Sequence, residues 1–216
     1  MYWIYYTGIF LIRMVLFLLT RYRVNGEENI PAQGPLLIVA NHISMADPPI
    51  LGASIGRKAM FMAKEELFRA RFSSYVIRSF GAFPVRRGGL DRKSLNQAEQ
   101  WLARGMVLVM FPEGQRSKTT QLQPAFSGSA LIASRIGAPI LPVGITGTEK
   151  IKGMNWWLRR PKITVNIGHP FHPSPGSDKL TKSELAQQTN AIMEHIAELL
   201  PPEYRGHYTG EEHKKA

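Results

Sequence analysis

The turn from Asn41 to Asp47 carries two side chains that could act together in proton transfer. It follows an apolar run at 36–40 and precedes Pro48-Pro49, which predicts a buried strand, a short turn and then a helix capped by Asp47. Histidine titrates near neutral pH, and a carboxylate on one ring nitrogen leaves the other nitrogen free to accept a proton. On a regular helix His42 and Asp47 would lie about 140° apart, so pairing requires a turn that folds back. The alternative is that Asp47 only caps a helix and His42 is an ordinary polar residue.

Two further apolar strands are predicted to end in polar turns. The run at 83–85 leads into Arg86 and Arg87, and the run at 106–111 leads into a segment that contains Glu113 and Arg116. Because the carboxyl ends of strands gather at one edge of an α/β sheet, we expect these turns to meet the His42 turn there. This convergence favours a catalytic site over a capped helix.

Strands and helices alternate along the chain, and the strands are apolar throughout. This pattern predicts an α/β fold with a largely parallel or mixed central sheet covered by helices. We divide the chain into a membrane-associated helix (1–20), one catalytic domain (21–200) and a disordered polar tail (201–216). Within the domain we expect strands at 22–24, 36–40, 59–63, 83–85, 106–111, 139–145 and 162–167. We expect helices at 50–55, 65–80, 92–103, 126–136 and 182–200. Asp91 would cap the helix at 92–103, and a capping box of Thr181 and Glu184 would open the last helix.

The net charge of +11 is concentrated in part of the chain. Residues 57–93 contain ten Lys or Arg and three acidic residues. Such a surface attracts nucleic acid, anionic lipid or a phosphorylated substrate, and charge alone does not choose among them. The absence of cysteine excludes disulfides, thiolate nucleophiles and cysteine zinc sites.

The amino-terminal segment, Met1 to Leu19, favours lipid as the partner. It is almost entirely apolar and rich in aromatic residues, but it is short for a membrane span and has Arg13 at its middle. It lacks the basic start and cleavage site of a signal peptide. We therefore expect a retained helix that lies in the membrane interface, or dips into one leaflet with Arg13 reaching toward the headgroups. Arg21 and Arg23 would place the remaining chain on the cytoplasmic face of the cell membrane. The alternative is a buried core helix; a nucleic-acid partner is not expected.

Four ordered motifs resemble those of the glycerolipid acyltransferases, and in particular the bacterial 1-acylglycerol-3-phosphate acyltransferases. They extend over most of the chain, from about Arg23 to Pro170, and they read Asn41-His42-x4-Asp47, Phe83-Pro84-Val85-Arg86, Phe111-Pro112-Glu113-Gly114-x-Arg116-Ser117 and Leu141-Pro142-Val143.

The resemblance implies a direct acyl transfer with His42 as general base and Asp47 as its partner. Arg86, Glu113, Gly114 and Arg116 would form the glycerol-phosphate site. The acyl group would pass from a thioester co-substrate, acyl-CoA or acyl carrier protein, to the sn-2 hydroxyl of lysophosphatidic acid, giving phosphatidic acid. No metal and no other cofactor is implied.

Two positions depart from the family pattern, and they leave the acceptor open. Gln115 stands where the family usually has Thr or Ser, and Ser127 stands where it commonly has Lys. The same chemistry on another lyso-lipid or on glycerol-3-phosphate is therefore an alternative, and a non-catalytic binder of anionic lipid is a more distant one. Ser44 as a nucleophile, and His169 with His172 as metal ligands, are less favoured readings of the same sequence.

Overall fold

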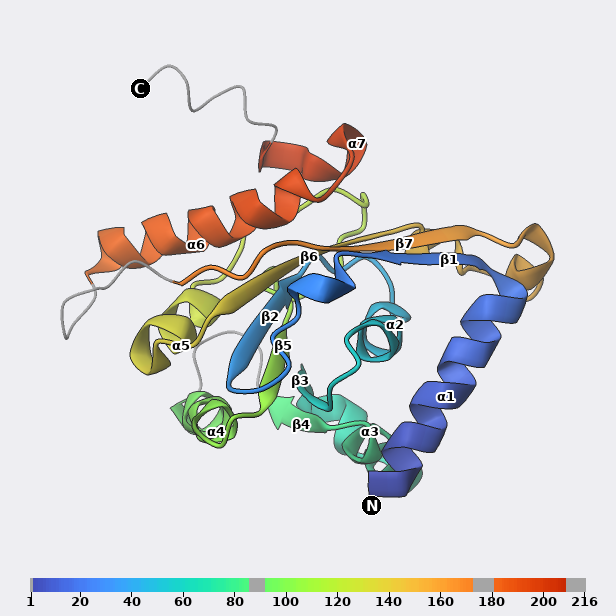
Figure 1. Cartoon of the computed structure of the whole chain (residues 1–216), viewed down its shortest axis with the longest axis horizontal. Helices are drawn as coiled ribbons and strands as arrows, with labels where there is room; N and C mark the ends of the chain where they lie inside the picture. The colour runs from blue at the N-terminus through green and yellow to red at the C-terminus, as the bar shows by residue number, and fades with distance from the viewer. Residues whose placement is uncertain (1, 86–91, 173–180, 209–216) are drawn as a thin grey trace.

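A seven-stranded mixed sheet forms the centre of the protein in a computed structural model that describes residues 2–85, 92–172 and 181–208 (Figure 1). The strands lie in the order β1-β7-β6-β2-β5-β3-β4, and every neighbouring pair is parallel except β6 and β7. This arrangement confirms the predicted fold class. The strands are β1 (Arg21–Asn25), β2 (Leu36–Ala40), β3 (Ala59–Lys64), β4 (Ala82–Val85), β5 (Val107–Met110), β6 (Ile140–Thr146) and β7 (Lys162–Ile167).

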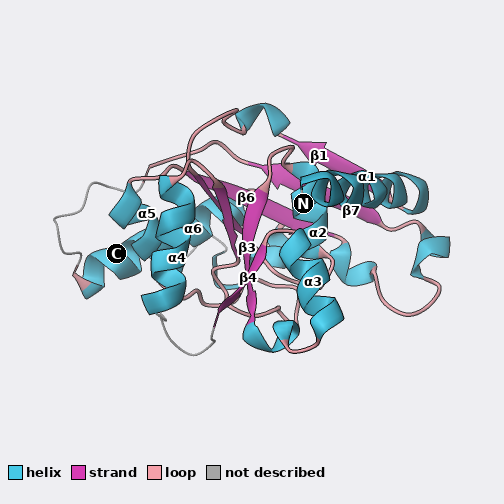
Figure 2. Cartoon of the chain, turned by 90° about the horizontal axis from the view of Figure 1, so that it is seen from below, coloured by secondary structure: helices cyan, strands magenta, loops and turns pink. Residues whose placement is uncertain are grey.

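Helices cover both faces of the sheet (Figure 2). One face carries α1 (Tyr2–Leu19), α2 (Asp47–Ser54) and α3 (Arg71–Ser79), and the other carries α4 (Arg92–Ala103), α5 (Gly128–Ile136) and α6 (Lys182–Glu198). All five residues of β2 are buried, with Leu36, Ile38 and Ala40 in one core cluster and Leu37 and Val39 in the other. A strand buried on both faces has no polar alternation, which explains its unbroken apolar run.

Helix α1 packs on the domain through one face and exposes the other. Tyr5, Ile9 and Leu16 are buried, while Trp3 and Phe17 are more than 70% exposed. Arg13 is exposed, and its Nε donates to the carbonyl of Ala53 at 2.8 Å. The expectation that Arg13 reaches toward lipid headgroups stays a prediction, because one guanidinium nitrogen binds a carbonyl near the end of α2 while the side chain remains exposed. None of the described helices is long and apolar enough to cross a membrane.

The structure corrects two boundaries. The helix expected over 65–80 divides into a 3-10 turn, η2 (Glu65–Phe68), and α3, because Ala70 between them has an extended backbone (φ −81°, ψ 133°). The first part of the tail expected to be disordered instead forms α7 (Pro202–Arg205) and η5 (Gly206–Tyr208), and residues 209–216 lie outside the described residues. Proline suits the first turn of a helix, and the Tyr204 carbonyl accepts the Leu122 N–H at 2.8 Å, which ties this turn to the domain. Asp91 and its expected cap lie outside the described residues.

The strand directions determine which turns meet. Strands β2 to β6 are mutually parallel, so their carboxyl ends lie at one edge of the sheet. Strands β1 and β7 run in the opposite direction, so their amino ends lie at that same edge. The capping box of α6 is confirmed: Thr181 and Glu184 exchange hydrogen bonds at its first turn.

Candidate active site

The turn after β2 brings the two predicted side chains together. His42 Nδ1 lies 2.8 Å from Asp47 Oδ2, and the same oxygen accepts the N–H groups of Ile43 and Ser44 at 2.7 Å each. Asp47 is the first residue of α2 and Ala46 is its N-cap, so the expectation that Asp47 caps this helix is wrong. Its carboxylate turns back and satisfies the preceding turn instead. This local folding gives the fold-back that the pairing requires.

The end of strand β6 supports this turn from the neighbouring position in the sheet. The Thr148 hydroxyl, in η3 (Thr148–Lys150), donates to Asp47 Oδ1. The Asn41 side chain accepts the Ile145 N–H at 2.7 Å and donates to the Ile145 carbonyl at 2.9 Å. Asp47 is completely buried, and a buried carboxylate is tolerated when its oxygens are hydrogen-bonded. Four donors meet that requirement and fix the orientation of the side chain.

The His42 ring lies on the wall of a cavity. Its ring stacks on Phe111, with 4.3 Å between centroids and 24° between planes, and its side chain is 14% exposed. Because Nδ1 is engaged with Asp47, Nε2 is the ring nitrogen that remains for a substrate. The arrangement provides a base, an orienting carboxylate and an adjacent space for a reacting group.

Glu113 holds the main chain of His42. Its Oε1 accepts the His42 N–H at 2.8 Å, and its Oε2 accepts the Gln123 N–H at 3.0 Å. The His42 carbonyl in turn accepts the Ser117 N–H at 2.7 Å. Both carboxylate oxygens of this almost fully buried side chain are engaged with main-chain groups. This geometry favours a positioning role over the substrate-binding role that the resemblance implies.

Burial sets the protonation chemistry of Glu113. Loss of water raises the pKa of its carboxyl to about 7, although the hydrogen bonds from His42 and Gln123 act to lower it. The negative charge of Asp47 adds to the upward shift of this pKa.

The other two predicted residues of the third motif, Gly114 and Arg116, differ in whether they line the cavity. Gly114 lines the cavity with φ +66°, and a Cβ there would lie 2.8 Å from the Phe126 ring. Glycine is therefore required by both backbone and space. Gln115 also lines the cavity, whereas Arg116 is exposed and is not among the described residues of its wall. Arg86, the remaining predicted residue, lies outside the described part of the chain.

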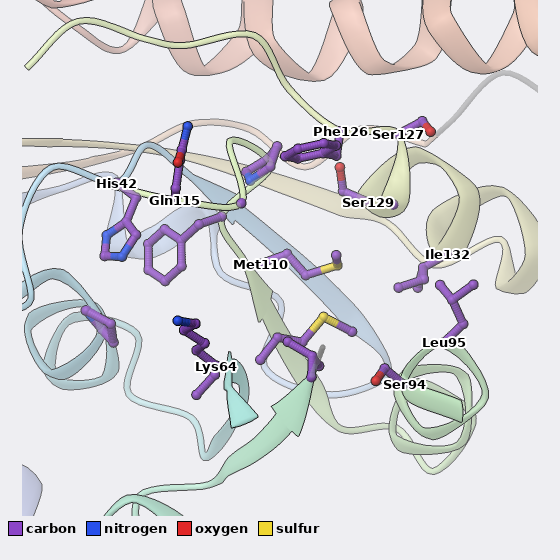
Figure 3. A pocket seen from close by; sticks show the side chains of 18 of the residues that line it. His42, Lys64, Ser94, Leu95, Met110, Gln115, Phe126, Ser127, Ser129 and Ile132 are labelled. Carbon is purple, nitrogen blue, oxygen red and sulfur yellow. The ribbon is translucent and has the colours of Figure 1, made fainter. Parts of the chain in front are cut away.

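The cavity has a volume of about 700 Å³ and extends from the His42 turn to the helices on one face of the sheet (Figure 3). His42 and Lys64 lie toward one end, and Leu95 and Ile132 lie toward the other. Its walls away from His42 are mainly apolar, formed by side chains of β3, β4, β5, α4 and α5: Met62, Val85, Leu95, Met110 and Ile132. Such a space suits an alkyl chain.

Lys64 is a candidate binding residue that the sequence analysis missed. It is the last residue of β3, it lines the cavity, and its Nζ lies 2.9 Å from Glu66 Oε1. Both side chains of this ion pair are about 40% exposed, so an anionic substrate can compete for the ammonium. The available signal was its place at the carboxyl end of an apolar run. Thr148 had the same signal after the strand at 139–145.

Comparison with known proteins agrees with this geometry. A family model described as "Acyltransferase" matches residues 21–146. The 1-acyl-sn-glycerol-3-phosphate acyltransferase of Bacillus subtilis is 29% identical over 189 residues, which cover 87% of this chain and 92% of the relative. The lyso-ornithine lipid O-acyltransferase of Pseudomonas aeruginosa is 34% identical over 185 residues, covering 77% and 69% of the two chains.

A solved structure has the same fold. The crystal structure of the 1-acyl-sn-glycerophosphate (LPA) acyltransferase PlsC from Thermotoga maritima aligns with a TM-score of 0.70 and 26% identity. The alignment covers 89% of this chain and 77% of that one. The chain belongs to the acyltransferase family, in the branch that includes the 1-acylglycerol-3-phosphate acyltransferases, and it is an O-acyltransferase.

Proposed function

We propose that the protein transfers an acyl group from a thioester, acyl-CoA or acyl carrier protein, to the sn-2 hydroxyl of 1-acylglycerol-3-phosphate and so forms phosphatidic acid. The observation that carries this proposal is the His42–Asp47 pair, 2.8 Å apart, on the wall of a largely apolar cavity. The names of the Bacillus subtilis and Thermotoga maritima relatives support the choice of acceptor.

The reaction needs a base and no covalent enzyme intermediate. His42 Nε2 accepts the proton of the acceptor hydroxyl as its oxygen attacks the thioester carbonyl. The tetrahedral intermediate then expels the thiolate, which takes the proton back from the imidazolium. A positioned base of this kind contributes about 10²–10⁴-fold. Asp47 holds the Nδ1–H tautomer and stabilises the imidazolium.

The cavity provides separate environments for the acyl chain and for the phosphate of the substrates. Apolar walls around Met110 and Ile132 suit an acyl chain, while Lys64 near the His42 end supplies a cation for a phosphate. Glu113 positions the base through the His42 main chain and leaves the phosphate to the basic side chains. Arg116, exposed beside this end, is a second cation for a headgroup that arrives from outside.

We place the enzyme on the cytoplasmic face of the cell membrane. The outward face of α1 exposes Trp3, Phe10 and Phe17, and Arg21 and Arg23 follow it directly. An apolar helical face with aromatic residues and flanking basic residues is typical of interfacial attachment. The acceptor is a membrane lipid, so attachment brings the enzyme to it.

A second candidate acceptor is a lyso-ornithine lipid. The Pseudomonas aeruginosa relative with this name is 34% identical to the chain. Two neutral side chains, Gln115 and Ser127, line the cavity at the positions where this chain departs from the family pattern. Ornithine carries both an amine and a carboxyl group, so its headgroup requires fewer cations than a phosphate does.

The test compares acceptors and separates chemistry from binding. Purified protein in detergent should release free thiol from acyl-CoA only in the presence of an acceptor, and His42→Ala should abolish this release while the protein stays folded. His172→Ala, which removes an exposed histidine, is the matched control and should retain full turnover. Undiminished turnover by the His42 variant would overturn the mechanism.

The acceptor panel contains lysophosphatidic acid, lyso-ornithine lipid and glycerol-3-phosphate, each with acyl-CoA and acyl-carrier-protein donors. Lysophosphatidic acid should give the highest kcat/KM. A higher kcat/KM for lyso-ornithine lipid would identify that lipid, and not lysophosphatidic acid, as the preferred acceptor. Lipid binding with no turnover on any acceptor would contradict both.

A further inference from the structure

A second surface has the composition of a lipid-binding site, and α1 does not contain it. We call it the η4 surface, because it surrounds the 3-10 turn η4 (Trp156–Arg159) between β6 and β7. Its apolar side chains are unusually exposed: Met154 by 91% and Leu158 by 63%, with Trp157 also exposed. Residues 150–162 include five basic side chains and no acidic one: Lys150, Lys152, Arg159, Arg160 and Lys162.

The η4 surface lies next to the carboxyl end of α1. The Arg21 N–H donates to the Pro161 carbonyl at 2.9 Å, and Arg21 pairs with Lys162 where β1 and β7 begin. Figure 1 shows the end of α1 and the loop that leads into β7 at the same end of the molecule. Phe17 and Leu18 are exposed in this last turn of α1, so both elements present apolar side chains at this end of the molecule.

The sheet topology places this surface at the catalytic edge. The segment 148–161 connects the carboxyl end of β6 to the amino end of β7, and both ends lie at the edge that carries the His42 turn. Its first residue, Thr148, donates to Asp47, the partner of His42. A flat partner that contacts both η4 and α1 would thus lie beside the entrance to the active site.

We propose that the η4 surface is a second membrane contact, which docks on an anionic lipid bilayer together with α1 and turns the catalytic edge toward it. Tryptophan is favoured at the headgroup level, where its ring is buried and its N–H stays hydrated. Met154 and Leu158 reach the acyl region, while the basic side chains attract anionic headgroups.

An acidic carrier protein is the competing occupant for a basic surface. A mainly electrostatic contact requires no exposed Met154 or Leu158, whereas a bilayer gives these side chains an apolar environment. Continuity with the exposed face of α1 also favours a partner that extends over both elements. The lipid bilayer is therefore the occupant that the surface fits best.

The test measures binding of the full chain to vesicles by flotation, without turnover. One variant, Met154→Ser with Leu158→Ser, removes the most exposed apolar groups, and another, Lys152→Gln with Arg159→Gln, removes two charges. Vesicles are phosphatidylcholine alone or mixed with phosphatidylglycerol. Each variant should bind the mixed vesicles at least fivefold more weakly than the wild type, and the deficit of the charge variant should disappear at high salt. The control, Arg104→Gln with Lys182→Gln, removes two exposed charges elsewhere and should bind normally.

Turnover measured separately distinguishes the remaining outcomes. Activity of the variants on a short-chain acceptor in detergent should equal that of the wild type, and a matching loss there would overturn docking in favour of a structural role. Normal vesicle binding with a raised KM for acyl carrier protein would assign the surface to that protein instead. Because binding is scored without chemistry, failure of the proposed acyl transfer would leave this result intact.

Discussion

His42 is held at its side chain and at its main chain, by groups from three parts of the sequence. Asp47 fixes the ring, Glu113 accepts the main-chain N–H, and Ser117 donates to the carbonyl. Thr148 then restrains the remaining oxygen of Asp47. A general base loses efficiency when its hydrogen-bond geometry drifts, so these contacts have a direct consequence for rate.

Replacement of Asp47 by Asn should lower kcat about 10²–10⁴-fold with little change in KM. The amide keeps the size of the side chain but does not hold the Nδ1–H tautomer or stabilise the imidazolium. Steady-state kinetics measure kcat and KM separately, and a thermal melt checks that the variant is folded. Thr148→Val keeps the contact between His42 and Asp47 Oδ2 intact, so it should lower kcat by less than Asp47→Asn does. An Asp47→Asn turnover within threefold of the wild type would show that the carboxylate does not assist the base.

Glu113 should make stability depend on pH. Its pKa is raised from 4.5 to about 7 by burial, so the folded state binds this proton more tightly than the unfolded state does. The resulting stabilisation is fully present below about pH 4.5 and is lost as pH rises through 7. Between pH 5 and pH 8 the loss is on the order of 2 kcal/mol.

The Glu113→Gln variant isolates this effect. It should lack that part of the pH dependence of the unfolding free energy, measured by denaturant titration at several pH values. Glu66→Gln is a control at an exposed carboxylate whose pKa is lowered by the hydrogen bond from Lys64, and it should leave the pH 5–8 slope close to that of the wild type. An identical slope for the Glu113 variant and the wild type would refute the assignment.

At the scale of elements, the cavity is made by helices and strands that are distant in sequence. Strands β3 and β5 form its floor, and α4 and α5 approach at the end away from His42. In the proposed reaction, Leu95 on α4 and Ile132 on α5 would bound the space into which the acyl chain extends. The size of their side chains controls the available length.

Replacement of Leu95 by Phe should shift the preferred acyl chain to shorter lengths by about two carbons, because added volume at this end removes space in a close-packed wall. The measurement is kcat/KM over a series of saturated acyl-CoA substrates. Leu102→Phe, on the same helix and fully buried but not on the cavity wall, is the matched control. It should lower stability without a change in the chain-length profile; an equal shift in both variants would place the chain elsewhere.

At the scale of the whole molecule, apolar and basic groups gather on one part of the surface. Helix α1 exposes Trp3, Phe10 and Phe17, while its opposite face packs into the core with Ile9 and Leu16. The helix is thus both a core element and an exposed apolar surface. The buried face agrees with a core helix, and attachment of the exposed face to a membrane stays a prediction.

Removal of the exposed aromatic groups of α1 should release the protein from membranes. Phe10→Ser with Phe17→Ser removes apolar area that is more than 60% exposed, so the folded state loses little packing. Fractionation of cell lysates should show a shift from the membrane pellet to the supernatant. A pellet fraction equal to that of the wild type after both substitutions would contradict attachment through α1.

Local patterns in the sequence predicted much of this protein. Unbroken apolar runs identified the central strands β2, β5 and β6, because strands buried on both faces have no polar alternation. The His42–Asp47 pairing was accessible because both residues lie in one turn, and the capping box of α6 is equally local. Four ordered motifs identified the family, and the comparisons confirm that family.

Tertiary structure alone decided the contacts that depend on strand order. Asp47 and Thr148 are 101 positions apart, and they meet because β6 lies beside β2. The hydrogen bond from the His42 main-chain N–H to Glu113 depends on the position of β5 on the other side of β2. The hydrogen bond from Arg13 to the Ala53 carbonyl similarly depends on the position of α2 beside α1. The sequence determines which strands and turns form, whereas packing among distant elements determines which side chains those turns bring into contact.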